Sequence, residues 1–212
     1  AQACRRQGIP LEAEPIAWQG YIIRCFPQVN RTVVLVAALD PAGVLYGAVT
    51  LSQMLSRKDN ETSLPVADVA DWPDFKHRMG NLLLQDFERG GEAWAREKID
   101  WFLQYKYDCI LVGIPKREHW GWVKAVVDYA RRRGVTLLFF GNWAVGSKQG
   151  LAADLRFDGC VEQEGEYFTW GRDDLLRDKA EALAAFLEAT GAQAMGLHCL
   201  DSDREGFDRR GP

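Results

Sequence analysis

Three acidic residues near the end of the sequence have the types and the spacing that acid–base chemistry uses. Asp201, Asp203 and Glu205 alternate with other residues in LDSDREGF, directly after the apolar run AMGLHCL. Alternate side chains of a strand share one face, and neighbouring carboxylates at the end of a buried strand can donate and accept protons. The alternative is a solvated loop of alternating charge.

Metal and cofactor sites are not indicated by the sequence. D-x-D-x-E resembles the start of a calcium loop, but the glycine and the distant glutamate of such a loop are not at their places. The five cysteines are an odd number without a C-x-x-C pair, which argues against a zinc knuckle and a disulfide framework. Neither G-x-G-x-x-G nor G-x-x-x-x-G-K-[ST] occurs. We therefore predict no metal and no cofactor.

The acidic stretch follows the last of several alternating strands and helices that begin after Arg78. Apolar runs predict strands at Gly80–Gln85, Cys109–Ile114, Val135–Phe140 and Ala194–Leu200, and helical periodicity predicts helices at Gly91–Tyr105, Trp120–Arg133 and Asp173–Thr190. Helices between apolar strands imply a parallel sheet. The sheet is either open and doubly wound or the first half of a (β/α)8 barrel. The barrel requires a chain cut near its midpoint, because a complete one takes about 250 residues.

A separate unit precedes these repeats. Trp18–Phe26 and Arg31–Leu39 are rich in β-branched and aromatic residues, which predicts two strands joined by a turn. Asp40, Pro41 and Gly43 predict the turn into a helix that ends near Leu55. SRKDNETS (56–63) is expected to be a loop, and the proline-containing LPVADVADWPDFKHR an extended linker.

Composition limits the classes of partner. The chain of 212 residues has a net charge of -4 and a pI near 5.5, and it lacks the basic stripe that neutralises phosphates. No apolar stretch approaches the roughly 20 residues of a membrane span. We therefore expect neither a nucleic-acid nor a membrane partner. The sequence leaves the oligomeric state and the compartment open.

The segments QGYIIRC, VVLVAALDPAGVLYGAVTLSQML and LPVADVADWPDFKHRMG, between Gly20 and Gly80, carry a family resemblance. In order and spacing they resemble the N-terminal α/β domain and barrel entry of family 20 glycoside hydrolases, the β-N-acetylhexosaminidases. Family 84 enzymes and α-glucuronidases have a similar leading domain. The resemblance implies an N-terminal α/β domain at 1–66 and the first four βα units of a TIM barrel at 67–212, with a carbohydrate substrate and a secreted or periplasmic location.

The resemblance also suggests residues that bind the sugar. Asp86 and Arg89 follow the first barrel strand, where the family has an arginine that binds sugar hydroxyls. The alternative for Arg89 is a local ion pair with Glu88. His119 lies in the second loop, although the family's His-Trp-His motif is absent. Trp143 follows the third strand. It is either a platform for the apolar face of a pyranose or a residue that packs within the protein. His198 matches the histidine of the family's fourth strand.

The family's fourth strand continues into an Asp-Glu pair, for which this chain has Ser202 and Asp203. The resemblance implies substrate-assisted hydrolysis, with Asp203 as general acid, Asp201 holding the acetamido group, and Glu205 able to replace either. The missing pair equally suits a carbohydrate-binding protein without catalysis. Another glycosidase specificity, such as α-glucuronidase, and an open-sheet enzyme unrelated to sugars remain alternatives. We expect the 212-residue chain alone to be inactive, because half a barrel lacks the residues of the last four strands.

Overall fold

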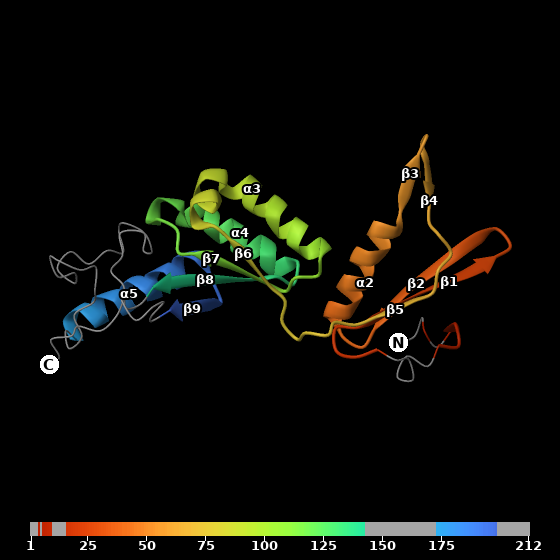
Figure 1. Ribbon diagram of the computed structural model, residues 1–212, viewed down its shortest axis with the longest axis horizontal. Helices are drawn as coiled ribbons and strands as arrows, with labels where there is room; N and C mark the ends of the chain where they lie inside the picture. Colours follow the sequence, from red (N-terminus) through yellow and green to blue (C-terminus); the bar gives the residue numbers. More distant parts are fainter. Residues whose placement is uncertain (1–3, 5, 10–15, 143–172, 199–212) are drawn as a thin grey trace. The chain divides into compact units, whose positions relative to one another are not determined.

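A computed structural model describes residues 4, 6–9, 16–142 and 173–198 of the chain. The chain divides into two compact units, Ala1–Arg78 and Met79–Pro212. Figure 1 shows their helices and strands, and each unit is treated by itself. In the part of the chain that is described, no helix is long and apolar enough to cross a membrane.

The first unit is a three-stranded sheet covered by one helix. The predicted hairpin is confirmed, with β1 (Tyr21–Gln28) and β2 (Arg31–Ala38) antiparallel and Gln28 opposite Arg31. The predicted helix is α2 (Pro41–Met54). The helix lies close against the strands at Gly47, where a Cβ would come 2.5 Å from Val36 Cγ1. The lack of a side chain at Gly47 allows this approach.

Two segments of this unit differ from the prediction. The expected loop at 56–63 is a short hairpin of β3 (Ser56–Lys58) and β4 (Glu61–Ser63). Its turn residues Asp59 and Asn60 have φ of 48° and 67°, a conformation that Asp and Asn tolerate. The expected linker contains β5 (Val69–Asp71), which pairs with β1 and completes the sheet. Strands this short show no hydrophobic alternation that the sequence could reveal.

The second unit is built on four parallel strands. These are β6 (Met79–Leu82), β7 (Cys109–Gly113), β8 (Thr136–Asn142) and β9 (Ala194–His198). They lie in the order β6-β7-β8-β9, so each strand pairs with the next along the chain. A doubly wound sheet reverses its strand order, whereas this order is that of consecutive barrel strands.

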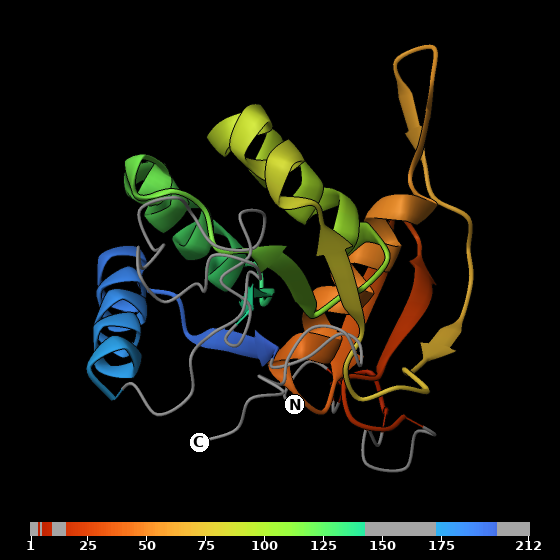
Figure 2. The same cartoon turned by 60° about the vertical axis from the view of Figure 1, so that its left-hand side comes forward.

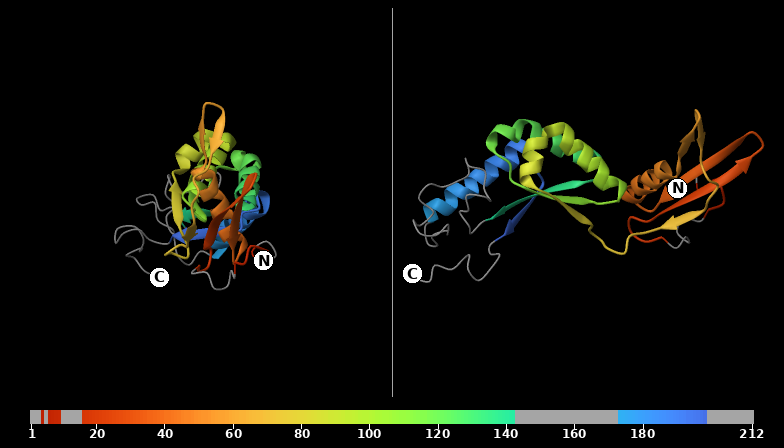
Figure 3. Two further views of the ribbon diagram at one scale, coloured as in Figure 1. Left: turned by 90° about the vertical axis from the view of Figure 1, so that its right-hand side faces the viewer. Right: turned by 45° about the horizontal axis from the view of Figure 1, so that its top comes forward.

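The helices of this unit lie on one face of its sheet, as Figures 2 and 3 show. They are α3 (Leu84–Gln104), α4 (Trp120–Arg132) and α5 (Asp173–Thr190). Alternate strand residues, Ile110, Val112 and Phe139, are fully buried in one core with residues of the three helices. The intervening Leu111 and Leu138 are only partly buried. Helices on a single face fit a partial barrel.

The first helix of this unit begins seven residues earlier than predicted. Its first turns, Leu84–Gly90, come directly after β6 and precede a break at Gly91, where φ is 66° and ψ is -164°. The glycine pair therefore marks a kink within α3 rather than its start. Phe87 is fully buried and anchors this early segment in the core.

Candidate functional site

The carboxyl ends of the four parallel strands meet at one edge of the sheet. Leu82 pairs with Val112, Gly113 with Phe140, and Asn142 with His198. Two segments that follow strands at this edge are described, Leu83–Arg89 after β6 and Ile114–His119 after β7. We call them the rim segments. Barrel enzymes place their active sites in such loops.

The first rim segment holds two of the predicted sugar-binding residues. Arg89 Nη2 lies 2.6 Å from Asp86 Oδ1, one turn earlier in α3, and the arginine side chain is 82% exposed. The ion pair of Arg89 with Glu88 that the sequence offered as an alternative is therefore wrong: Arg89 pairs with Asp86, because residues three apart face each other on a helix. An exposed pair of this kind leaves the guanidinium free to exchange partners.

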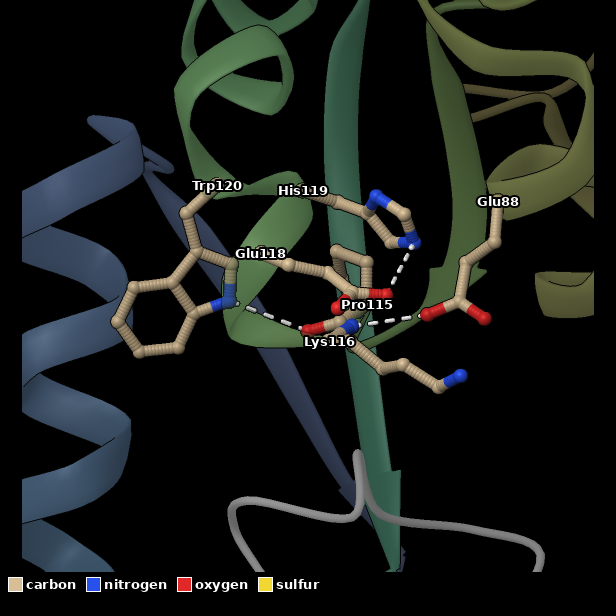
Figure 4. A network of polar contacts seen from close by, with 6 residues as sticks. All are labelled: Glu88, Pro115, Lys116, Glu118, His119 and Trp120. Carbon is tan, nitrogen blue, oxygen red and sulfur yellow. Dashed lines mark hydrogen bonds and ion pairs between the residues drawn. The ribbon is translucent and has the colours of Figure 1, made fainter.

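Glu88 instead connects the two rim segments. Its Oε1 accepts a hydrogen bond of 2.8 Å from the backbone N–H of Lys116, as Figure 4 shows. Sequence reasoning assigned Glu88 no role in a site. The contact joins residues 28 positions apart, and no sequence spacing predicts it.

The second rim segment is folded by its own hydrogen bonds. The short helix η2 (Arg117–His119) begins after Lys116, whose carbonyl accepts from the His119 N–H at 2.9 Å. The Trp120 indole Nε1 donates to the Pro115 carbonyl at 3.1 Å. Trp120 is buried against Phe186 of α5, with ring centroids 5.4 Å apart. This tryptophan is a packing residue.

His119, a predicted sugar-binding residue, lies in this segment with part of its surface accessible. Its Nε2 is 3.6 Å from Glu118 Oε1, and its side chain is 23% exposed. Its ring centroid lies 5.6 Å from that of Trp122, which in turn contacts Phe87 of the first rim segment at 5.0 Å. The imidazole therefore packs against the Trp122 ring at the carboxyl edge of the sheet.

The other predicted site residues are at strand ends or outside the described residues. The backbone of His198 ends β9 beside Asn142 of β8. Trp143, Asp201, Asp203 and Glu205 lie outside the described residues. Within the described residues, no group of three His, Cys, Asp or Glu side chains could hold a metal ion.

Two groups with shifted pKa values lie away from the rim segments. Burial raises the pKa of the Cys109 thiol, at the start of β7, and the charge of Asp108 adds to the shift. Burial also raises the pKa of Tyr129, whose hydroxyl donates to Asp100 at 2.7 Å. Both shifts come from packing and local partners.

Solved structures of glycoside hydrolases share this fold. A mutant Streptomyces plicatus β-hexosaminidase in complex with its product GlcNAc is 16% identical, with a TM-score of 0.65 over 88% of this chain and 45% of the enzyme. The family 20 β-N-acetylhexosaminidase of Streptomyces coelicolor A3(2) is 17% identical, with a TM-score of 0.59 over 85% and 44%. The exo-β-N-acetylglucosaminidase of Vibrio harveyi in complex with N-acetylglucosamine is 12% identical, with a TM-score of 0.61 over 81% and 35%.

These likenesses establish the fold, and the chain spans less than half the length of each of these enzymes. No family model matches the chain. No curated protein matches its sequence.

Proposed function

We propose that the chain forms the N-terminal domain and first four strands of a barrel in a glycoside hydrolase-like protein that acts on β-linked N-acetylhexosaminides. The observation that carries the proposal is the shared fold of this chain and enzymes crystallised with N-acetylglucosamine. The polar rim segments at the carboxyl edge of the parallel sheet support it, because barrel enzymes bind substrates there. Asp86, Arg89, His119, Trp143 and His198 are the proposed sugar-binding residues.

The proposed reaction is hydrolysis assisted by the substrate. The acetamido oxygen attacks the anomeric carbon, and the bond from that carbon to the leaving oxygen breaks as Asp203 gives the oxygen its proton. Asp201 holds the acetamido N–H, and Glu205 can replace either acid. Water then opens the cyclic intermediate and returns a proton to Asp203. The 212-residue chain alone is expected to lack turnover, since the rest of the barrel lines such a site.

A second function, carbohydrate binding without catalysis, is supported by the sequence. Ser202 stands where the family has the aspartate of its Asp-Glu pair, and the His-Trp-His motif is missing from the second loop. Another sugar, such as glucuronic acid, is an alternative substrate. Turnover separates an enzyme from a binder, and the choice of ligand separates the specificities.

Calorimetric titrations of the 212-residue chain with N-acetylglucosamine, glucuronic acid and glucose test sugar binding. We expect N-acetylglucosamine to bind most tightly, with a dissociation constant of about 1 mM, which corresponds to about -4 kcal/mol. The absence of saturable binding by all three sugars would reject the proposed site.

The catalytic assignment needs an assay of the longer protein with an aryl N-acetyl-β-glucosaminide. Asp203→Asn keeps the size of the side chain and removes the acid, so turnover should fall by at least about 100-fold. Undiminished turnover in Asp203→Asn would exclude this residue as the general acid. A wild-type protein that binds the sugar but never cleaves the glycoside would support the binding function.

A further inference from the structure

We infer that Glu88 is a positioning residue, which fixes the second rim segment so that Lys116 and His119 face the ligand. The inference rests on the proposed carbohydrate site and adds a residue that acts on it indirectly. Glu88 itself need not touch the sugar, because its Oε1 is already engaged by the Lys116 N–H at 2.8 Å.

The backbone that carries Glu88 is held firmly. The preceding residue, Phe87, is fully buried and packs on Trp122 of α4. Leu84, one turn earlier, lies so close to β7 that a Cβ at Gly113 would be 3.0 Å from Leu84 Cβ. The early turns of α3 therefore present the Glu88 carboxylate from a packed element, which favours a defined geometry over that of a loop.

At the Lys116 N–H, the second rim segment takes its hydrogen-bond partner from the first rim segment. Ile114 N–H is bonded to the Phe140 carbonyl at 3.2 Å, and Pro115 has no N–H. The bonds from His119 and Trp120 are internal to the segment and its adjoining helix. Glu88 thus supplies a charge-assisted bond from a different βα unit, the stronger kind of hydrogen bond.

The link places two polar side chains on the same side as Glu88. In Figure 4 the Lys116 chain and the His119 imidazole extend toward the Glu88 side of the segment, and Trp120 extends to the other side. Lys116 is exposed, and its ammonium forms no ion pair with any described residue. Fixing the Lys116 backbone lowers the conformational entropy that the segment loses on binding a sugar.

Amide exchange and sugar binding, measured on the 212-residue chain, test the inference together. In Glu88→Ala, we expect the Lys116 amide to exchange at least about tenfold faster and the affinity for N-acetylglucosamine to fall by about threefold to tenfold. Glu88→Gln keeps a carbonyl acceptor and should restore most of both. Glu97→Ala is the matched control, because Glu97 is an exposed carboxylate of α3 whose partner is Lys98; it should change neither.

The outcomes separate the inference from the proposed function. Unchanged Lys116 exchange in Glu88→Ala, or a Glu88→Gln variant as impaired as Glu88→Ala, would overturn the positioning role. Faster exchange in Glu88→Ala with unaltered sugar affinity would also overturn it, because Glu88 would then fix the second rim segment without any effect on sugar binding. If the wild type binds no sugar at all, the proposed function fails, while the exchange rates still decide whether Glu88 holds the segment.

Discussion

At the scale of single residues, Arg78 links segments of the first unit that are far apart in the sequence. Its guanidinium donates to Gln19 Oε1 at 2.7 Å and to the Phe75 carbonyl at 2.9 Å, and it lies 5.2 Å from the centre of the Tyr46 ring. The Gln19 N–H in turn donates to Asp40 Oδ2 at 2.7 Å, and Asp40 caps α2. One polar network therefore joins the helix motif to the residue before β6.

Replacing Arg78 should destabilise the first unit. Arg78→Ala removes two hydrogen bonds and a cation–π contact, and we expect a loss of about 1–3 kcal/mol in the free energy of unfolding. Arg78→Lys should recover only part, because an ammonium cannot reproduce the planar fork. Urea denaturation measures both, with Arg57→Ala in the exposed hairpin as control. Equal stability of Arg78→Ala and Arg57→Ala would contradict this account of the network.

A second residue, Tyr129, gives a pH-dependent prediction. Burial and the hydrogen bond to Asp100 raise its pKa in the folded chain, so the folded state keeps the phenol proton to higher pH than the unfolded state. The resulting stabilisation is complete below the unfolded value of about 10 and is lost as pH rises through the folded pKa. Between about pH 9 and pH 11, wild type should therefore lose more stability than Tyr129→Phe. Parallel curves of unfolding free energy against pH would refute the assignment.

At the scale of elements, the break in α3 sets where the first rim segment lies. Gly91 combines φ of 66° with ψ of -164°, a region open essentially only to glycine. The segment before the break carries Asp86, Glu88 and Arg89, and the segment after it packs on the sheet. The glycine therefore allows one helix to serve both the core and the rim.

Gly91→Ala should cost stability although it creates no clash. A Cβ at Gly91 meets nothing within 4 Å, so the expected loss of about 1–3 kcal/mol comes from backbone strain alone. Gly121→Ala is a matched control, since a Cβ there also meets nothing but the residue lies within α4. Alanine is the better helix former there, so Gly121→Ala should stabilise by about 0.4–1 kcal/mol. Thermal unfolding compares the two, and the opposite order would disprove the strain.

The sequence predicted the elements that have strong local signals. The predicted helices Trp120–Arg133 and Asp173–Thr190 agree closely with α4 and α5, which are followed by Gly134 and Gly191 with φ of 67° and 68°, as is common after a helix. The sequence did not predict the three-residue strands β3, β4 and β5, because these strands form by pairing with neighbours and show no pattern of their own. The sequence did not predict the Glu88 link, because the link depends on how the first turns of α3 and the segment after β7 come together. Local sequence thus indicated the strands, the helices and a parallel sheet, whereas the strand order and the contacts across the rim required the structure.

At the scale of the whole chain, the parallel sheet of the second unit has two edges without a described partner strand. Among the described strands, β6 and β9 each have a partner on one side only. The face away from the helices carries partly buried Leu111, Leu138 and Phe140. Open edges and apolar faces invite association.

We expect the 212-residue chain to associate as its concentration rises and to bind a hydrophobic dye. Light scattering after size-exclusion chromatography measures the first property, and dye fluorescence measures the second. A charged residue on the open face, as in Leu138→Lys, should reduce both more than Val29→Lys in the exposed turn of the first unit. A monomer at all concentrations without dye binding would show that these surfaces are covered.

The most direct test of the central claim is an NMR titration of the isotope-labelled chain with N-acetylglucosamine. We predict saturable chemical-shift changes in the rim segments, at Glu88, Lys116 and His119, with little change at Cys109 on the opposite edge of the sheet. Saturable changes confined to the opposite edge or to the first unit, or no saturable change, would contradict a sugar site at the carboxyl ends of the strands.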